Sequence, residues 1–201
     1  MRTTTGWRAT GPAALRRTEI PRRDLRPDDI AVRVDYCGVC HSDLHALRDH
    51  DPHALLVPGH EFTGVVTATG PEVTAFSIGD HVAVGNIVDS CGTCGMCRAG
   101  QENFCHSFPT LTYGGDGSTT LGGFSREYVV RDAFAYPLPS GLDSAAAAPL
   151  MCAGVTVWEP LHFLGVGSGS RIAVAGLGGL GHLAVKMAVA LGATTTVISR
   201  T

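Results

Sequence analysis

Over about the first three quarters of the chain, short apolar runs alternate with polar turns. Ile30–Tyr36, Phe62–Ala68 and Tyr128–Val130 are rich in β-branched and aromatic residues, and turn signals such as Gly79-Asp80 separate them. Runs of this length with such punctuation are typical of strands joined by loops. The pattern therefore predicts a β-rich domain over residues 1–150.

The pattern changes in the last quarter of the chain. Ala153–Leu164 has the composition of a helix, although Pro160 is expected to kink or end it. The apolar run Arg171–Ala175 predicts a buried parallel strand. Leu180–Leu191 has helical periodicity, and the β-branched run Thr194–Ser199 predicts a second strand.

This strand–helix–strand order predicts the first βαβ unit of an α/β Rossmann domain in residues 151–201. Such a domain is built from two βαβαβ halves, so about half of it is missing by this count. We therefore expect the chain to be truncated. The alternative is a compact end with two strands, although a parallel sheet normally has both faces covered.

Composition narrows the class of protein. The net charge is -3, and no Lys/Arg run suggests a nucleic acid or a membrane surface as partner. No apolar stretch approaches the roughly 20 residues of a spanning helix. The Arg-rich N-terminus is a weak match to a transit peptide, and a first strand around Trp7 is the alternative. We expect a cytoplasmic protein.

Four of the seven cysteines form a cluster with the spacing C-x2-C-x2-C-x7-C. Four thiolates this close suit one tetrahedral Zn²⁺ without an open position, which is a structural site. An iron–sulfur cluster is the competing interpretation, but the last spacing differs from that of ferredoxins and no proline follows. The predicted ligands are Cys91, Cys94, Cys97 and Cys105.

Three further segments offer dispersed ligands: Cys37–His45, Gly59-His60-Glu61 and Met151–Gly154. Two thiolates and one imidazole with a vacant fourth position form a catalytic zinc set. Spacing alone does not show that they converge. A single cysteine such as Cys152 is more often a small buried apolar residue, and a single histidine is more often a surface or core residue.

Several motifs together resemble one family. Gly59-His60-Glu61-Phe62-Thr63-Gly64, with Gly70 and Val73 following, is similar to the zinc alcohol dehydrogenase signature. The four-cysteine cluster, Cys40-His41-Ser42-Asp43-Leu44-His45 and Met151-Cys152-Ala153-Gly154 agree with it in family order. The closest resemblance is to the cinnamyl-alcohol-dehydrogenase-like branch of the medium-chain dehydrogenases. It implies a GroES-like catalytic domain followed by a Rossmann domain.

The resemblance also implies roles for the dispersed residues. Cys40, His60 and Cys152 would hold a catalytic zinc, with Glu61 beside it as an occasional alternate ligand. Asp43 would orient the His60 ring through its free N–H. Cys37 would lie outside the coordination sphere.

A proton relay is the last implied part of the catalytic site. Ser42 would provide its first hydroxyl and His45 its exit base, because the pKa of histidine lies near neutrality. Without the family resemblance, Ser42 would be read as a helix-cap residue and His45 as a solvated imidazole.

The segment Gly176-Leu177-Gly178-Gly179-Leu180-Gly181 satisfies the dinucleotide fingerprint G-x-G-x-x-G. The predicted strand before it and helix after it are the required context. Gly176 would permit the turn, Gly178 the approach of a pyrophosphate, and Gly181 the packing of helix on strand. A plain glycine-rich turn is the alternative.

The second predicted strand ends in Ser199-Arg200-Thr201, where an enzyme that prefers NAD would carry an acidic residue. Ser199 can hydrogen-bond a phosphate and Arg200 can pair with it. We therefore predict NADP(H) rather than NAD(H), with Gly176, Gly178, Gly179 and Gly181 around the pyrophosphate.

These expectations combine into one function. The chain would interconvert a primary alcohol and an aldehyde with NADP(H) and two zinc ions, one catalytic and one structural. Its partner would be a small alcohol or aldehyde, with no nucleic acid or membrane, and the complete protein would form a homodimer. A polyol dehydrogenase of the same superfamily and a catalytically inert zinc-binding fragment are the alternatives.

Overall fold

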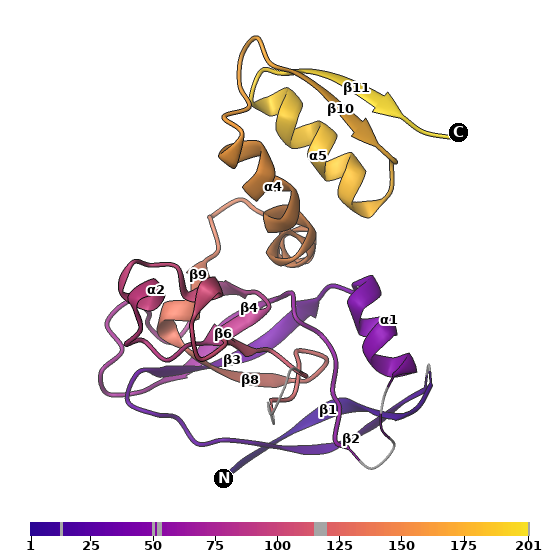
Figure 1. Ribbon diagram of the computed structural model, residues 1–201. Coiled ribbons are helices and arrows are strands. Elements are labelled where there is room, and N and C mark those ends of the chain that lie inside the picture. Colours follow the sequence, from indigo (N-terminus) through magenta and orange to yellow (C-terminus); the bar gives the residue numbers. More distant parts are fainter. Residues whose placement is uncertain (13, 50, 52–53, 115–119, 201) are drawn as a thin grey trace. The chain divides into compact units, whose positions relative to one another are not determined.

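The computed structural model describes residues 1–12, 14–49, 51, 54–114 and 120–200 of the 201-residue chain. Contacts between Cα atoms divide the chain into two compact units, Met1–Met151 and Cys152–Thr201. Figure 1 shows strands dominating the first unit, and helices α4 and α5 beside a pair of strands in the second.

The first unit is built mainly from short strands. They are β1 (Arg2–Gly11), β2 (Ala14–Arg22), β3 (Asp29–Cys37), β4 (Phe62–Thr69), β5 (His81–Val84), β6 (Ile87–Asp89), β7 (Thr110–Leu111), β8 (Glu127–Arg131) and β9 (Ala135–Pro137). Its α-helices are α1 (His41–Arg48), α2 (Gly95–Arg98) and α3 (Ser144–Ala147), and its 3-10 helices are η1 (Glu102–Phe104), η2 (Asp132–Phe134) and η3 (Ala148–Met151).

An antiparallel sheet with the strand order β8-β3-β4-β5-β9 forms the body of this unit. Ile30 and Val32 on β3 are fully buried. They pack with Phe62, Val82 and Val130 from the neighbouring strands. The sheet confirms the β-rich fold predicted from the apolar runs.

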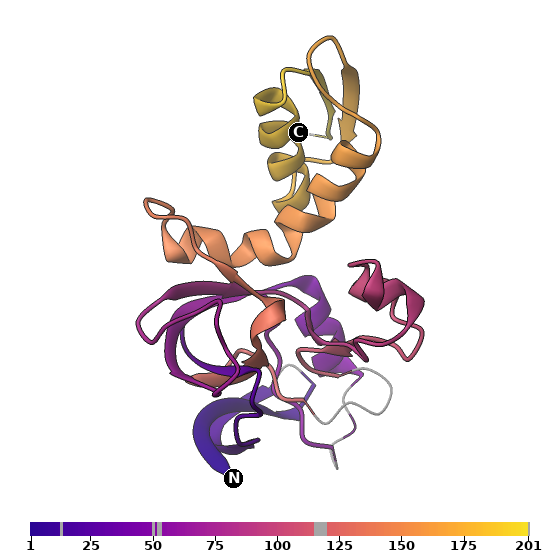
Figure 2. The same cartoon turned by 90° about the vertical axis from the view of Figure 1, so that its left-hand side faces the viewer.

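Smaller sheets border this body. β1 and β2 form an antiparallel hairpin, and β6 pairs with β7. Figure 2 shows the segment around α2, between β6 and β7, standing out from the sheets of the first unit. This projecting segment carries the clustered cysteines.

The second unit has the predicted strand–helix–strand order. Its elements are α4 (Ala153–Phe163), β10 (Arg171–Ala175), α5 (Gly179–Ala190) and β11 (Thr194–Ile198). β10 and β11 are parallel, with Arg171 opposite Thr194 and Ala175 opposite Ile198. This is the βαβ unit of the predicted α/β fold.

Pro160 does not end helix α4, which continues to Phe163. The proline lies in the last turn, where its missing N–H removes one hydrogen bond. The backbone N–H of Leu164 still donates to the Pro160 carbonyl at 3.0 Å, so the turn closes beyond the proline. Of the two expected effects of Pro160, a kink or an end of the helix, the end does not occur at this position.

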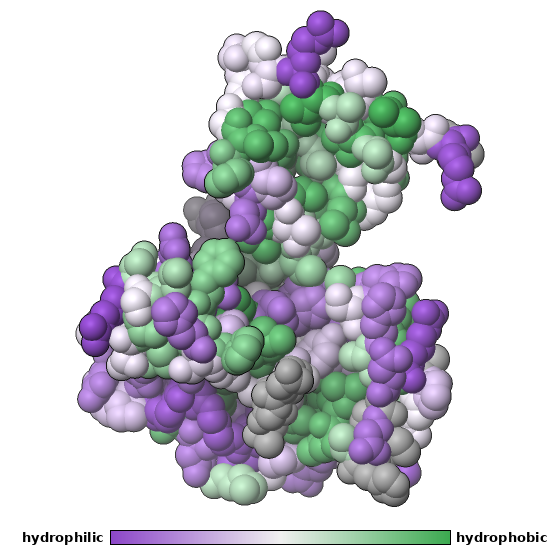
Figure 3. All heavy atoms as spheres, in the orientation of Figure 1, coloured by the Kyte–Doolittle hydropathy of each residue, from purple (hydrophilic) through white to green (hydrophobic). Residues whose placement is uncertain are grey.

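Much of the visible surface of the second unit is hydrophobic (Figure 3). Leu180 and Val189 on α5 are 49% and 57% exposed, and Ile198 on β11 is 60% exposed. In parallel-sheet folds, helices normally cover both faces of the sheet and bury such side chains. Among the helices in the described part of the chain, none has the length and apolar character needed to span a membrane.

Candidate metal centres and cofactor loop

The four clustered cysteines converge in the projecting segment. Cys91 follows β6, Cys94 caps the N-terminus of α2, Cys97 lies within α2, and Cys105 follows η1. Their Sγ atoms all lie within 4.8 Å of one another. The donors are four thiols arranged as a closed set, which fits the coordination of a structural zinc ion.

Backbone amides support the sulfur atoms of this four-cysteine site. The N–H of Cys94 donates to Cys91 Sγ at 3.4 Å, and the N–H of Cys97 donates to Cys94 Sγ at 3.5 Å. Hydrogen bonds from the Thr93 and Cys94 backbones lower the pKa of Cys91 to about 5. The thiolate, which is the form that binds metal, is thereby favoured.

The dispersed residues also converge. Cys40 is the N-cap of α1, His60 lies just before β4, and Cys152 is the N-cap of α4. One ligand atom from each lies within 4.8 Å of the other two. Cys152 is joined by one peptide bond to Met151, whose carbonyl oxygen packs against Gly85 of the first unit. We call this group the three-residue site.

Asp43 links two ligand segments of this site. The carboxylate accepts hydrogen bonds from the backbone N–H groups of Cys40 and Gly59, each at 2.9 Å. Its Oδ1 also lies 3.3 Å from Nδ1 of His60 and accepts a 2.6 Å bond from the Tyr113 hydroxyl. This arrangement fixes both the ring and the backbone next to the ligands.

Burial and hydrogen bonding shift the pKa values of Asp43 and His60 in opposite directions. Burial favours the neutral carboxyl, but bonds from His60, Tyr113 and the two amides hold the pKa of Asp43 below its ordinary value. Burial likewise disfavours a charged His60, yet the hydrogen bond and charge of Asp43 raise the pKa of His60. Asp43 is therefore an anionic acceptor for the imidazole N–H.

Two neighbouring residues lie outside the three-atom group. Glu61 is only 3% exposed, and burial raises its pKa to about 7. Burial raises the pKa of Cys37 to about 12, and its sulfur is not among the three ligand atoms that converge. Cys37 is thus distinguished from the cysteines of the site.

Ser42 and His45 lie on helix α1, directly after Cys40. The Oγ of Ser42 is 3.6 Å from Cys40 Sγ. His45 is exposed, and its ring meets that of His41 edge-on with 4.8 Å between centroids. The two predicted relay residues are three positions apart on a helix, so they share one face.

The glycine loop joins β10 to α5. Gly176 has φ of +88°, a backbone conformation that favours glycine. A Cβ on Gly181 would overlap the Gly176 carbonyl oxygen, so the helix start approaches the strand too closely for any side chain. A hollow is lined by Gly176, Leu177, Ile198, Ser199 and Arg200. The loop and the end of β11 therefore face one space.

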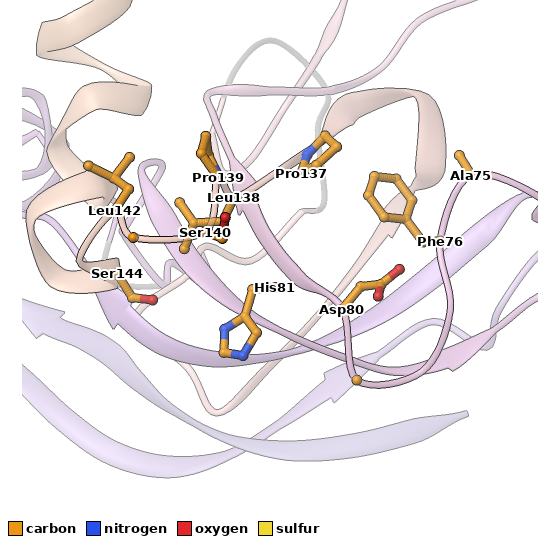
Figure 4. Close-up of a pocket in the computed structure, with 12 residues that line it drawn as sticks. Ala75, Phe76, Asp80, His81, Pro137, Leu138, Pro139, Ser140, Leu142 and Ser144 are labelled. Carbon is orange, nitrogen blue, oxygen red and sulfur yellow. The ribbon is translucent and has the colours of Figure 1, made fainter.

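Another hollow, of about 550 Å³, lies in the first unit near the start of β5 and the end of β9 (Figure 4). Figure 4 shows Asp80 and His81 on one side of it and Leu142 and Ser144 on the other. None of the residues that line it belongs to the predicted metal or cofactor sets.

Tyr113 is the functional contact that the sequence did not reveal. Its hydroxyl donates to Asp43 Oδ1 at 2.6 Å. The two residues are 70 positions apart, and no spacing rule joins them.

Known proteins agree with this architecture. Residues 26–140 match the alcohol dehydrogenase GroES-like domain. The chain is 45% identical over 193 residues to "Probable formaldehyde dehydrogenase AdhA" of Bacillus subtilis, covering 94% of this chain and 55% of that protein. It is 45% identical over 197 residues to "NADP-dependent alcohol dehydrogenase C" of Mycobacterium bovis, and this match covers 96% of this chain and 56% of that protein.

The fold matches a cinnamyl alcohol dehydrogenase of Sorghum bicolor with a TM-score of 0.91 and 42% identity, over 100% of this chain and 59% of the other. The chain spans about half the length of the curated relatives it matches. The resemblance seen in the motifs is confirmed. Because its GroES-like domain alone fills more than half of the sequence, the chain belongs to the medium-chain alcohol dehydrogenase family.

Proposed function

We propose that this chain supplies the zinc sites and the first part of the cofactor site of an NADP(H)-dependent enzyme. The enzyme would interconvert primary alcohols and aldehydes. One observation carries the proposal: Cys40, His60 and Cys152 come from three distant segments, yet their ligand atoms lie within 4.8 Å of one another. Two soft sulfurs and one imidazole match a catalytic zinc set with one position left for an oxygen ligand.

When bound there, zinc would act as a Lewis acid that polarises the substrate oxygen. The protein side chains would do the remaining work. Asp43 would hold the His60 ring so that its other nitrogen faces the ion. Ser42 would pass the alcohol proton along the α1 face toward His45, which is open to solvent.

Glu61 would remain beside the ion as an occasional alternate ligand. It follows His60 directly in sequence, and its side chain is only 3% exposed. The four-cysteine site would hold a second, structural zinc and stabilise the projecting segment.

NADP(H) is proposed over NAD(H) because Ser199 and Arg200 line the same hollow as Gly176. A cation at this end of β11 would pair with a 2′-phosphate, whereas an acidic residue would repel it. Gly178 and Gly179 at the start of α5 would face the pyrophosphate. NADP dependence of the mycobacterial relative supports the same choice.

We propose a domain division at residues 1–150 and 151–201, with a GroES-like catalytic part and a partial Rossmann part. Small alcohols or aldehydes would be the substrates, and the complete protein would be a homodimer. A cytoplasmic location is also part of the proposal.

The test is metal analysis combined with NADPH-dependent aldehyde reduction on the purified 201-residue chain. About two zinc ions per chain are expected. Turnover would show that the chain is active by itself, and two zinc ions without turnover would favour the inert zinc-binding alternative. Absence of zinc would contradict both.

A further inference from the structure

The hydroxyl of Tyr113 makes a short hydrogen bond to a buried carboxylate. It donates to Asp43 Oδ1 at 2.6 Å. Tyr113 is 8% exposed and Asp43 is 1% exposed, so water does not compete effectively for this contact. An O–H···O⁻ bond of this length in a buried place is among the stronger hydrogen bonds in proteins.

The same tyrosine also packs against the imidazole that Asp43 orients. The ring centroids of Tyr113 and His60 are 5.8 Å apart, with planes inclined by 52°. Tyr113 therefore contacts both partners of the Asp43–His60 pair. Its hydroxyl meets the carboxylate oxygen that lies next to the imidazole N–H, while its ring limits rotation of the imidazole.

The backbone that carries Tyr113 is held firmly. The N–H of the preceding residue, Thr112, donates to the Asn86 carbonyl at 2.8 Å, and its hydroxyl donates to the Gly85 carbonyl at 2.8 Å. The Thr112 carbonyl accepts a 2.9 Å bond from the buried Tyr128 hydroxyl. The position of the Tyr113 hydroxyl is thus set by the sheet and not by the metal ligands.

We propose that Tyr113 is a positioning residue for the three-residue site, acting through Asp43 to fix the His60 imidazole. This inference rests on the proposed metal-binding function. In Tyr113→Phe, Oδ1 would lose its shortest hydrogen bond and keep only the Gly59 amide and the longer His60 contact. The carboxylate would then turn toward the amides, and the ring would lose its fixed orientation.

The experiment measures Co²⁺ affinity at both sites of the 201-residue chain by absorption titration against a competing chelator. Cobalt with four thiolates and cobalt with two thiolates and an imidazole differ in charge-transfer absorption, and Cys152→Ser assigns the second signal. Tyr136→Phe is the control, because it also removes one tyrosine hydroxyl, and Tyr136 lies on β9 with 54% of its surface exposed.

In Tyr113→Phe the dissociation constant of the three-residue site should rise about tenfold, a size typical for loss of outer-sphere support. The four-cysteine site and the Tyr136→Phe variant should keep wild-type affinities. Equal weakening at both sites, an equal effect in Tyr136→Phe, or no effect would overturn the positioning role. If the wild-type chain shows no two-thiolate signal, the proposed metal function fails instead.

Discussion

Replacement of Asp43 by asparagine tests whether the site is organised before any metal binds. The side chain is 1% exposed and receives four contacts from donor groups, two of them from backbone amides. Asparagine keeps the shape but has only one acceptor atom. Its amide NH₂ must face at least one N–H that the carboxylate satisfied.

The loss in free energy of unfolding caused by Asp43→Asn follows from these contacts. In the better amide orientation, the Cys40 N–H faces the NH₂ group and loses its bond, while three contacts to Oδ1 become neutral. A hydrogen bond to a charged group contributes about 1.5–3 kcal/mol and a neutral one about 1 kcal/mol. Relief from burying a charge offsets part of this loss, so we expect about 2–4 kcal/mol of destabilisation.

Urea unfolding of the metal-free chain measures this loss. Trp7 fluorescence in a Trp158→Phe background reports on the first unit, because the chain has only two tryptophans. Asp35→Asn is the control, since Asp35 pairs with Arg33 on the surface and such pairs contribute about 1 kcal/mol or less. Equal midpoints for the two variants would refute the view that Asp43 organises the site.

Three further predictions concern the other sites. Cys105→Ser should lower the zinc content by about one ion per chain, whereas Cys37→Ser should leave it unchanged, as metal analysis can show. Gly181→Ala should weaken NADPH binding, measured by fluorescence, because the new Cβ would overlap the Gly176 carbonyl oxygen. Gly178→Ala should have only a small effect on folding, because a Cβ at that position meets no protein atom within 4 Å. Arg200→Glu should weaken NADPH binding at least about tenfold, because one lost charge-assisted hydrogen bond is worth about 1.5–3 kcal/mol. The affinity for NADH should stay nearly unchanged. Equal losses of affinity for both cofactors would contradict the proposed contact between Arg200 and the phosphate.

Local patterns predicted the elements well, because strand and helix periodicity are short-range properties. Ile30–Tyr36 became β3 (Asp29–Cys37), and Leu180–Leu191 became α5 (Gly179–Ala190). The sequence alone overstated the effect of Pro160 on helix α4. A proline near a helix end removes one hydrogen bond, whereas a proline in the middle of a helix disrupts a full turn.

The site was predictable only in part. The spacing of Cys91, Cys94 and Cys97 is itself a local pattern, but the convergence of Cys40 with Cys152 depends on the whole sheet and needed the family resemblance. Tyr113 had no such motif. Its partner Asp43 lies on α1, 70 positions earlier in the chain, so only the folded structure shows that the two are in contact.

The two metal sites differ in what holds them without an ion. In the three-residue site, buried hydrogen bonds around Asp43 hold the segments of Cys40 and His60 in place. The four-cysteine segment is anchored at its entrance by Asp89, which pairs with Arg26 at 2.7 Å and Arg131 at 3.4 Å, and these pairs are partly exposed. Such pairs stabilise weakly, so we expect that a bound zinc ion would order the projecting segment more than the sheet that carries it.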